Sequence, residues 1–232
     1  MSDATPSRLD DYLDVFVSPS ELFRRRSDGK FGQAVFVLVL LVAILFFATK
    51  SAMAPIMDAE MARSMASSTG TMTPEQLEAA KKFGGVFYGI TILVATPIAV
   101  FLLGFVVFLV ARLLSGPLSY AQGATIAVFS MFPRLIESIL NAVQALLMDE
   151  SKLTSRFSVS LGAGRFLDPA ATNPVLMAFA GRLDLFTIWV TVLIAIGLRV
   201  MGKLSTNQAA MGAAIVWLIG ALPVLIQGLT QK

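Results

Sequence analysis

The sequence predicts an all-α fold, a polytopic membrane helix bundle of five transmembrane helices preceded by short amphipathic helices. Of the 232 residues, 56% are hydrophobic and only 14% are charged, whereas soluble domains carry about 25% charged residues. Apolar runs long enough to cross a bilayer, about 18 residues or more, recur along the chain. The basic residues cluster at the ends of these runs, where they set the orientation of a membrane protein.

The residue types that are missing limit the reactions that the chain could catalyse and the metals that it could bind. The chain has no Cys and no His, which excludes thiol nucleophiles and Cys-ligated metals and removes the commonest general base. Gly162-Ala163-Gly164-Arg165 is not a phosphate-binding P-loop, because it lacks the P-loop Lys and the βαβ context. We therefore expect no enzymatic activity, no catalytic residue, no cofactor, no metal and no nucleic-acid partner.

Residues 1–30 form a polar segment before the first apolar run, and we expect this segment to be cytoplasmic. Apolar side chains at i, i+3, i+4 and i+7 predict a short amphipathic helix. Its apolar positions are Leu9, Tyr12, Leu13 and Phe16, and its acidic positions, on the opposite face, are Asp10, Asp11 and Asp14.

A second short helix is expected over Pro19–Arg26. Ser18 can cap this helix, Pro19 suits its first position and Glu21 completes a capping box. The two helices either lie at the membrane interface or form a docking site for a cytoplasmic partner. The acidic face favours docking, because anionic lipid prefers Lys and Arg. The candidate docking residues are Leu9, Tyr12, Leu13, Phe16, Leu22 and Phe23.

The first span is expected at about 32–53. Four basic residues precede it, so the positive-inside rule places the N-terminus in the cytoplasm; they are Arg24, Arg25, Arg26 and Lys30. A signal peptide cleaved at Ala52-Met53-Ala54 is the competing interpretation. The long polar leader argues against it.

A hydrophilic loop over residues 54–82 separates the first two spans. Thr73-Pro74-Glu75-Gln76 indicates a helix start within it. Its methionines could form a soft-metal site, but without Cys or His beside them ordinary packing is favoured; they are Met53, Met57, Met61, Met65 and Met72.

The second span is expected at about 86–109, with a kink at Pro97 and close helix contact at Gly85 and Gly89. A short turn at Gly116-Pro117 then returns the chain into the third span.

The third span, about 120–148, carries a polar stripe on an otherwise apolar helix. Steps of four, three, four and three residues place its members within an arc of about 80°; they are Ser130, Arg134, Glu137, Asn141 and Gln144. Such a stripe should face protein or water rather than lipid. Arg134 and Glu137 can pair, either to hold the bundle or to form a polar pathway. The span is too long for the bilayer, so it either breaks at Pro133 or emerges at its end.

The fourth and fifth spans are expected at about 184–200 and 209–227. Trp189 suits an outer aromatic belt, and Arg199 and Lys203 place the opposite end of the fourth span in the cytoplasm. The resulting topology has the N-terminus inside and the C-terminus outside. In the long outer loop, the alternation of Phe157, Val159 and Leu161 with Ser predicts a short strand or an extended segment.

Three motifs follow one another along these elements. Val17-Ser18-Pro19-Ser20-Glu21-Leu22-Phe23 precedes the first span. Ser119-Tyr120-Ala121-Gln122 and then Phe129-Ser130-x-x-Pro133 lie in the third. Leu183-Asp184-Leu185-Phe186-Thr187-Ile188-Trp189 opens the fourth, which continues through Ile196-Gly197-Leu198. Their order and spacing resemble the Yip domain family of multispan membrane proteins, over roughly residues 15–230.

The resemblance implies a cytoplasmic N-terminus and a Yip-like five-span membrane domain over residues 31–230. Eukaryotic relatives bind prenylated Rab-type GTPases, a role that the resemblance does not carry over to this chain. The short N-terminus and compact loops are similar to the prokaryotic branch, some of whose members are encoded beside ABC exporters. This implies a bacterial inner membrane. Arg134 and Glu137 lie outside the family motifs.

These observations favour a non-enzymatic integral membrane protein that acts as a scaffold or accessory partner of other membrane proteins, with an ABC-type exporter as one candidate. The alternative is a small transporter or channel that uses the polar face of the third span. The lipid bilayer is the expected surrounding, and the sequence leaves a homo-oligomer open.

Overall fold

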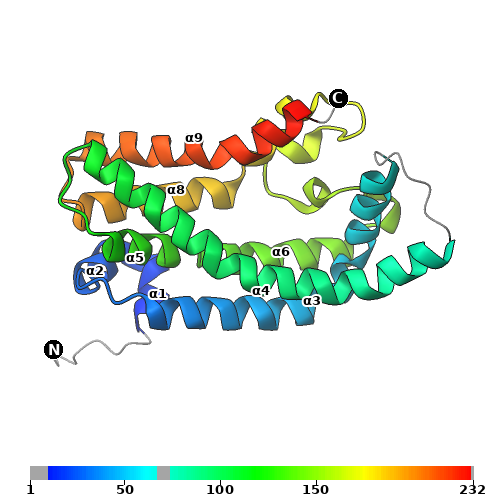
Figure 1. Cartoon of the computed structure of the whole chain (residues 1–232), viewed down its shortest axis with the longest axis horizontal. Helices are drawn as coiled ribbons and strands as arrows, with labels where there is room; N and C mark the ends of the chain where they lie inside the picture. The colour runs from blue at the N-terminus through cyan, green and yellow to red at the C-terminus, as the bar shows by residue number, and fades with distance from the viewer. Residues whose placement is uncertain (1–9, 67–73, 231–232) are drawn as a thin grey trace. The chain divides into compact units, whose positions relative to one another are not determined.

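The computed structural model describes residues 10–66 and 74–230. Within these ranges the chain is built from helices, with no β-strand and a single isolated bridge between Gly162 and Asp184. The α-helices in chain order (Figure 1) are α1 (Asp10–Val17), α2 (Pro19–Arg25), α3 (Gly32–Ala66), α4 (Pro74–Leu113), α5 (Tyr120–Ser130), α6 (Pro133–Leu147), α7 (Pro174–Arg182), α8 (Leu185–Val200) and α9 (Thr206–Thr230). The predicted all-α class is confirmed.

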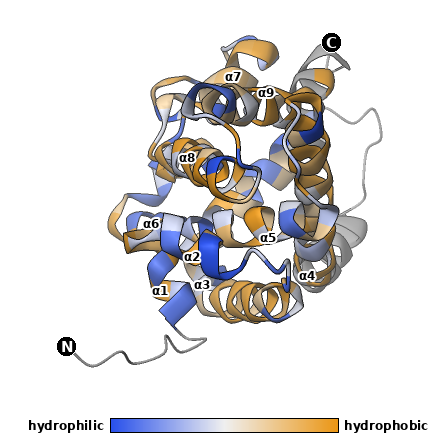
Figure 2. Cartoon of the chain, turned by 90° about the vertical axis from the view of Figure 1, so that its left-hand side faces the viewer, coloured by the Kyte–Doolittle hydropathy of each residue, from blue (hydrophilic) through white to orange (hydrophobic). Residues whose placement is uncertain are grey.

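Three stretches of the described residues are long and apolar enough to cross a membrane: Gly32–Arg63, Gly89–Leu113 and Tyr120–Leu147. The shorter helix α8 is also apolar, as the hydrophobic colouring in Figure 2 shows. Helix α9 contains the predicted fifth span. The chain is therefore an integral membrane protein in composition and architecture, while the count of five spans stays a prediction.

The first two spanning helices are longer than predicted. Helix α3 has 35 residues and continues to Ala66, where the sequence indicated an end near residue 53. At about 1.5 Å per residue such a helix measures about 52 Å, well beyond the roughly 30 Å hydrocarbon core. Helix α4 begins at Pro74, which confirms the helix start indicated by Thr73-Pro74-Glu75-Gln76, and it continues through the second span predicted at about 86–109. Both helices thus continue past the apolar core of a bilayer.

The predicted third span breaks into two helices. Helix α5 ends at Ser130, Met131 and Phe132 form a turn, and α6 begins at Pro133. Pro lacks a backbone N–H and its ring collides with the carbonyl four residues earlier, so a continuous helix cannot pass through it without loss. The break expected at Pro133 is confirmed.

The chain divides into two compact units. The first comprises Met1–Leu38, Ala99–Arg134 and Phe186–Pro223, and the second comprises Val39–Ile98, Leu135–Leu185 and Val224–Lys232. Each unit is described by itself.

Helix α5 is the centre of the first unit, and its residues from Gly123 to Ser130 are all buried. A Cβ added at Gly104 of α4 would lie 2.7 Å from the Ala124 Cα, so α4 and α5 touch backbone to backbone. On α8, a Cβ at Gly197 would lie 2.7 Å from Ile126. Glycine at these two positions is what lets α4 and α8 approach α5 so closely.

The second unit contains the extended end of α3, most of α6 and the loop that follows α6. Its small hydrophobic core consists of Ile56, Ala145, Leu153 and Val159, with Met53 and Met148 packed against it. Met53 therefore has the packing role favoured from the sequence, whereas Met65 and Met72 lie outside the side chains that the structure describes.

The loop does not contain the predicted strand. Arg156–Val159 forms a turn of 3-10 helix, capped by the side chain of Ser155, which accepts a hydrogen bond from the Phe157 amide. Alternation of apolar residues with Ser suggested an extended segment, but the side chains of Ser155 and Ser158 cap the turn instead.

Candidate functional site

The predicted polar stripe is divided by the break between α5 and α6. Ser130 is the last residue of α5, whereas Arg134, Glu137, Asn141 and Gln144 lie on α6. Ser130 is fully buried, and its hydroxyl has no hydrogen-bond partner among the residues that the structure describes. The five residues therefore do not lie on one uninterrupted helix, the four on α6 share a face by their spacing, and the common polar face of all five stays a prediction.

Arg134 connects the start of α6 to α8. Its Nη2 donates a hydrogen bond of 2.8 Å to Oγ1 of Thr187. Thr187 is buried, and its own helix carries the apolar residues of the predicted fourth span. Pairing between Arg134 and Glu137 stays a prediction. Within the first unit, the Arg134 contact connects the first turn of α6 to α8.

Gln144, at the other end of the stripe, holds the loop after α6. Its Nε2 donates 2.7 Å to the Val159 carbonyl, and its Oε1 accepts a longer bond of 3.3 Å from Arg165. On the opposite face of α6, apolar side chains are exposed, as a lipid-facing surface would be; they are Ile139, Leu140, Val143, Leu146 and Leu147.

Asn141 differs from Gln144, because its Oδ1 is buried without a hydrogen-bond partner in the described part of the chain. Buried polar atoms without hydrogen-bond partners are uncommon in proteins.

The predicted N-terminal docking residues differ in how far the structure buries them. Leu22 and Phe23 are fully buried, so they cannot be part of a docking surface, which corrects that prediction. Tyr12 packs against Phe129 and Phe132 at centroid distances of 6.2 and 5.3 Å. Leu13 is 69% exposed. Leu9 lies outside the described residues.

Phe16 is also used inside the chain, since its ring meets the ring of Trp189 edge to face at 5.8 Å. Together with Tyr12 it packs α1 against α5 and α8. Contact between α1 and α5 is visible in Figure 1, where the two helices lie side by side. The amphipathic helix is thus confirmed, but its apolar face is mostly turned inward.

The acidic face of α1 forms ion pairs with basic residues at the end of α2. Asp11 has a side chain only 4% exposed and accepts a bond of 2.8 Å from Nη2 of Arg25. Its second oxygen accepts a bond of 2.6 Å from Nε of Arg26. Hydrogen bonding to Asp11, although opposed by burial, raises the pKa of the Arg25 side chain. Two basic residues predicted to orient the chain therefore also join α1 to α2.

The start of α2 was predicted only in part. Pro19 occupies the first turn and Ser18 the cap position, but the Ser18 side chain makes no capping hydrogen bond. Glu21 pairs with Arg24 at 2.6 Å instead of closing a capping box.

Two capping boxes that were not predicted occur at the starts of α5 and α9. The backbone N–H of Ser119 donates a hydrogen bond of 2.9 Å to Oε1 of Gln122, and the backbone N–H of Gln122 donates to the Ser119 hydroxyl. Ser205 and Gln208 repeat the arrangement. The signal was present in the sequence, since Ser-x-x-Gln before an apolar run is a capping-box pattern.

Each of these glutamines has a further partner. Nε2 of Gln122 donates to the Ser27 carbonyl at 2.8 Å, and Nε2 of Gln208 lies 3.5 Å from the Leu114 carbonyl. The motif containing Ser119 and Gln122 thus has a structural role, which is to fix the entry of α5 beside the segment that follows α2.

These features define a class: an integral membrane protein whose N-terminal helices pack on a helical bundle. A family model of the Yip1 domain matches residues 13–226, and the chain belongs to the Yip1 domain family. The resemblance inferred from the three motifs is confirmed. Neither the curated proteins nor the solved structures contain a match to the chain.

Proposed function

We propose that this Yip1-domain membrane protein works without catalysing a reaction, as a scaffold or accessory partner of other membrane proteins. One candidate partner is an ABC-type exporter. The proposed setting is a bacterial inner membrane, with the N-terminus in the cytoplasm and the C-terminus outside.

The observation that carries the proposal is an exposed apolar strip on α1. Leu13 and Val17 are 69% and 75% exposed and lie four residues apart, on one side of the helix. Neither is part of a candidate membrane span, the first of which begins at Gly32. Burial of both by a partner would contribute about 1.5–3 kcal/mol per side chain.

The packing and ion pairs that hold α1 in place support this role. Val15 is fully buried, and Asp11 is bonded to Arg25 and Arg26, so α1 is held while its outer side stays open. A preorganised helix loses less conformational entropy when it binds, which favours docking.

The test is gentle affinity purification of the tagged full chain from its own membranes, followed by mass spectrometry. We expect wild type to retain a membrane-protein partner in stoichiometric amount and a Leu13→Ser, Val17→Ser double variant to lose it. Leu176→Ser, on an exposed site of α7, is the matched control and should retain the partner. Recovery of wild type without any partner would contradict the proposal.

A transporter that uses the polar stripe is the second candidate. It is favoured by the buried Ser130 hydroxyl and Asn141 Oδ1, which have no partner within the described residues and could contact water or a substrate. Against it, Arg134 and Gln144 are bonded to other parts of the protein.

Flux assays in liposomes separate the two candidates. The scaffold proposal predicts background flux for both wild type and Glu137→Gln. Flux in wild type that Glu137→Gln abolishes, at unchanged protein level and thermal stability, would favour the transporter.

A further inference from the structure

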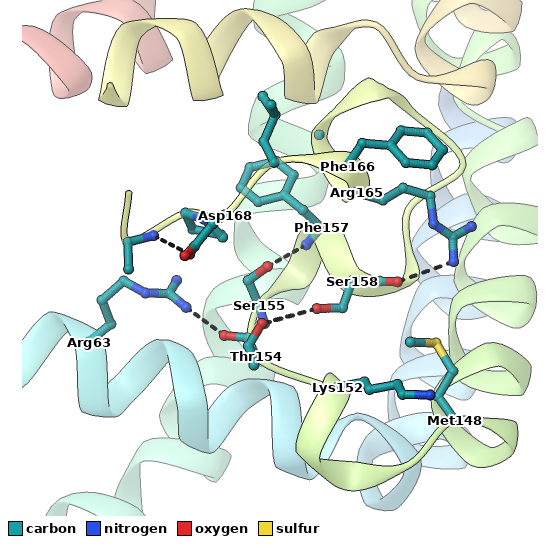
Figure 3. A pocket seen from close by; sticks show the side chains of 14 residues that line it. Arg63, Met148, Lys152, Thr154, Ser155, Phe157, Ser158, Arg165, Phe166 and Asp168 are labelled. Carbon is teal, nitrogen blue, oxygen red and sulfur yellow. Dashed lines mark hydrogen bonds between the residues drawn. The ribbon is translucent and has the colours of Figure 1, made fainter. Parts of the chain in front are cut away.

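The second unit contains a hollow of about 640 Å³ between the end of α3, the end of α6 and the loop that follows α6. Figure 3 shows its lining, with Arg63 contributed by α3 and Arg165 by the loop. The charged side chains at its surface are three basic and one acidic: Arg63, Lys152, Arg165 and Asp168. The excess of positive charge is the first indication of an anionic ligand.

Arg165 is the basic residue whose charge is least compensated. Its two hydrogen bonds go to neutral oxygens, Gln144 Oε1 at 3.3 Å and the Ser158 carbonyl at 3.4 Å. No carboxylate of the described residues pairs with it, although the residue is half-buried. Both bonds are longer than the usual 2.9–3.0 Å, and a half-buried guanidinium without a counter-charge favours an anion beside it.

The other charges are arranged differently. Arg63 lies 3.0 Å from Glu60, and Lys152 lies 3.3 Å from Asp149, so each has an acidic neighbour that is not in the lining. Asp168, the acid in the lining, accepts a hydrogen bond of 2.8 Å from the Ala170 amide in its own turn. Arg63 and Lys152 therefore add positive potential, whereas Arg165 has the capacity to bind an anion directly.

Hydroxyl groups lie between the basic residues. Oγ1 of Thr154 and Oγ of Ser158, both in the lining, are 3.5 Å apart, and Figure 3 draws this contact as a dashed line. Each hydroxyl can donate to an oxyanion. The combination of guanidinium and hydroxyl donors suits phosphate oxygens, for which Arg has a matching planar geometry.

The lining also contains apolar residues, among them Met148, Phe157 and Leu167. The hollow also adjoins the ends of two candidate membrane spans. Arg63 is the last residue of one, and Met148 follows the last residue of another. A ligand with a phosphate and a short apolar part would match both kinds of surface.

We propose that this hollow binds a phosphate-bearing anion, with Arg165 as the principal ligand. The shared chemistry is that of a phosphate group, supplied either by the headgroup of an anionic phospholipid or by free phosphate. Binding depends on side chains rather than on the backbone cradle of a P-loop. The inference is independent of the proposed scaffold function.

The experiment uses the full chain purified in an uncharged detergent. Native mass spectrometry measures binding of phosphatidylglycerol, with phosphatidylcholine as the zwitterionic reference, and calorimetry measures binding of inorganic phosphate. We expect either phosphatidylglycerol to bind at least about tenfold more tightly than phosphatidylcholine, or inorganic phosphate to bind. Arg165→Gln should lower that binding by about tenfold or more, as expected for loss of a charged hydrogen bond.

Two further variants sharpen the result. Arg156→Gln removes the same charge from the same loop but not from the lining, and it should retain binding. Lys152→Gln alters a side chain that is 67% exposed, so it should fold normally and weaken binding several-fold. Preference for phosphatidylglycerol identifies the lipid as the source, and binding of inorganic phosphate identifies a soluble anion. Absence of both, or unchanged binding in Arg165→Gln and Lys152→Gln, would overturn the proposal.

Discussion

Asp11 of α1 accepts a hydrogen bond of 2.6 Å from Nε of Arg26, which is 15 residues further along the chain. The same carboxylate also binds Arg25, so a single buried acid joins α1 to the end of α2. These ion pairs hold α1, and with it the exposed strip formed by Leu13 and Val17, against the end of α2. Their contribution to the free energy of unfolding can be measured.

Asp11→Asn keeps the shape of the side chain but removes its charge. Arg26 and Arg25, whose side chains are 18% and 29% exposed, would then lack their main counter-charge. We expect a loss of about 1–3 kcal/mol in the free energy of unfolding, between the values for exposed and for fully buried pairs. Asp14→Asn is the control, and it should cost less because Arg25 keeps Asp11.

The fluorescence of Trp189 can report this change, since its ring contacts Phe16 on α1. Measurements are made in a Trp217→Phe background, because the chain has 2 Trp residues. If the two Asp variants lose equal stability, the cluster does not centre on Asp11.

The Arg134–Thr187 hydrogen bond should appear as an energetic coupling between α6 and α8. A double-mutant cycle with Arg134→Met and Thr187→Val should give a coupling between about 0.6 kcal/mol, the average for hydrogen bonds between membrane helices, and about 1.7 kcal/mol, the largest value found for them. Thr191→Val is the matched control, because the Thr191 hydroxyl donates to the Thr187 carbonyl of its own helix. Equal coupling of Arg134 to both threonines would contradict the assignment.

The contact of α4 with α5 predicts intolerance of even a methyl group at Gly104. A Cβ there would lie 2.7 Å from the Ala124 Cα and 2.9 Å from its backbone nitrogen, and backbone atoms cannot rotate away. Gly104→Ala should therefore lower stability by about 1–3 kcal/mol. Thermal unfolding in detergent measures the loss.

Gly32→Ala is the control for this substitution, since a Cβ at Gly32 meets nothing within 4 Å. It should leave the melting temperature unchanged or raise it slightly, because Ala is the better helix former. Equal effects of the two substitutions would show that close packing is not the cause.

Gln122→Glu separates the two roles of that side chain. The carboxylate can still accept the Ser119 amide, but it no longer donates to the Ser27 carbonyl. We expect faster amide hydrogen exchange in residues 26–30, measured by mass spectrometry, with α5 itself protected as in wild type. Gln208→Glu loses the corresponding bond to Leu114 and should leave residues 26–30 unchanged.

Much of the architecture could be predicted because apolar runs and a proline are local signals. The break before Pro133 and the start of α3 at Gly32 both follow from them. The length of α3 could not be predicted in this way. Its extended end is packed through Met53 and Ile56 in a small core with Leu153 and Val159, which lie far away in the sequence.

The candidate site was harder to predict for the same reason. The acidic face of α1 was expected to favour docking of a partner, and only the tertiary structure shows that Asp11 is buried against Arg25 and Arg26. Arg165 received no role from the sequence, because its surroundings are formed by α6 and a turn around Ser158. Helical periodicity indicates which side chains share a face, but not which partner that face meets.

The bonds from Gln122 and Gln208 also bear on how the chain is made. They reach back 95 and 94 residues, to Ser27 and Leu114 respectively. Translation proceeds from the N-terminus at about 5–20 residues per second, so several seconds separate the synthesis of each glutamine from that of its carbonyl partner. The carbonyls of Ser27 and Leu114 therefore lack these glutamine partners until α5 and α9, respectively, have been synthesised.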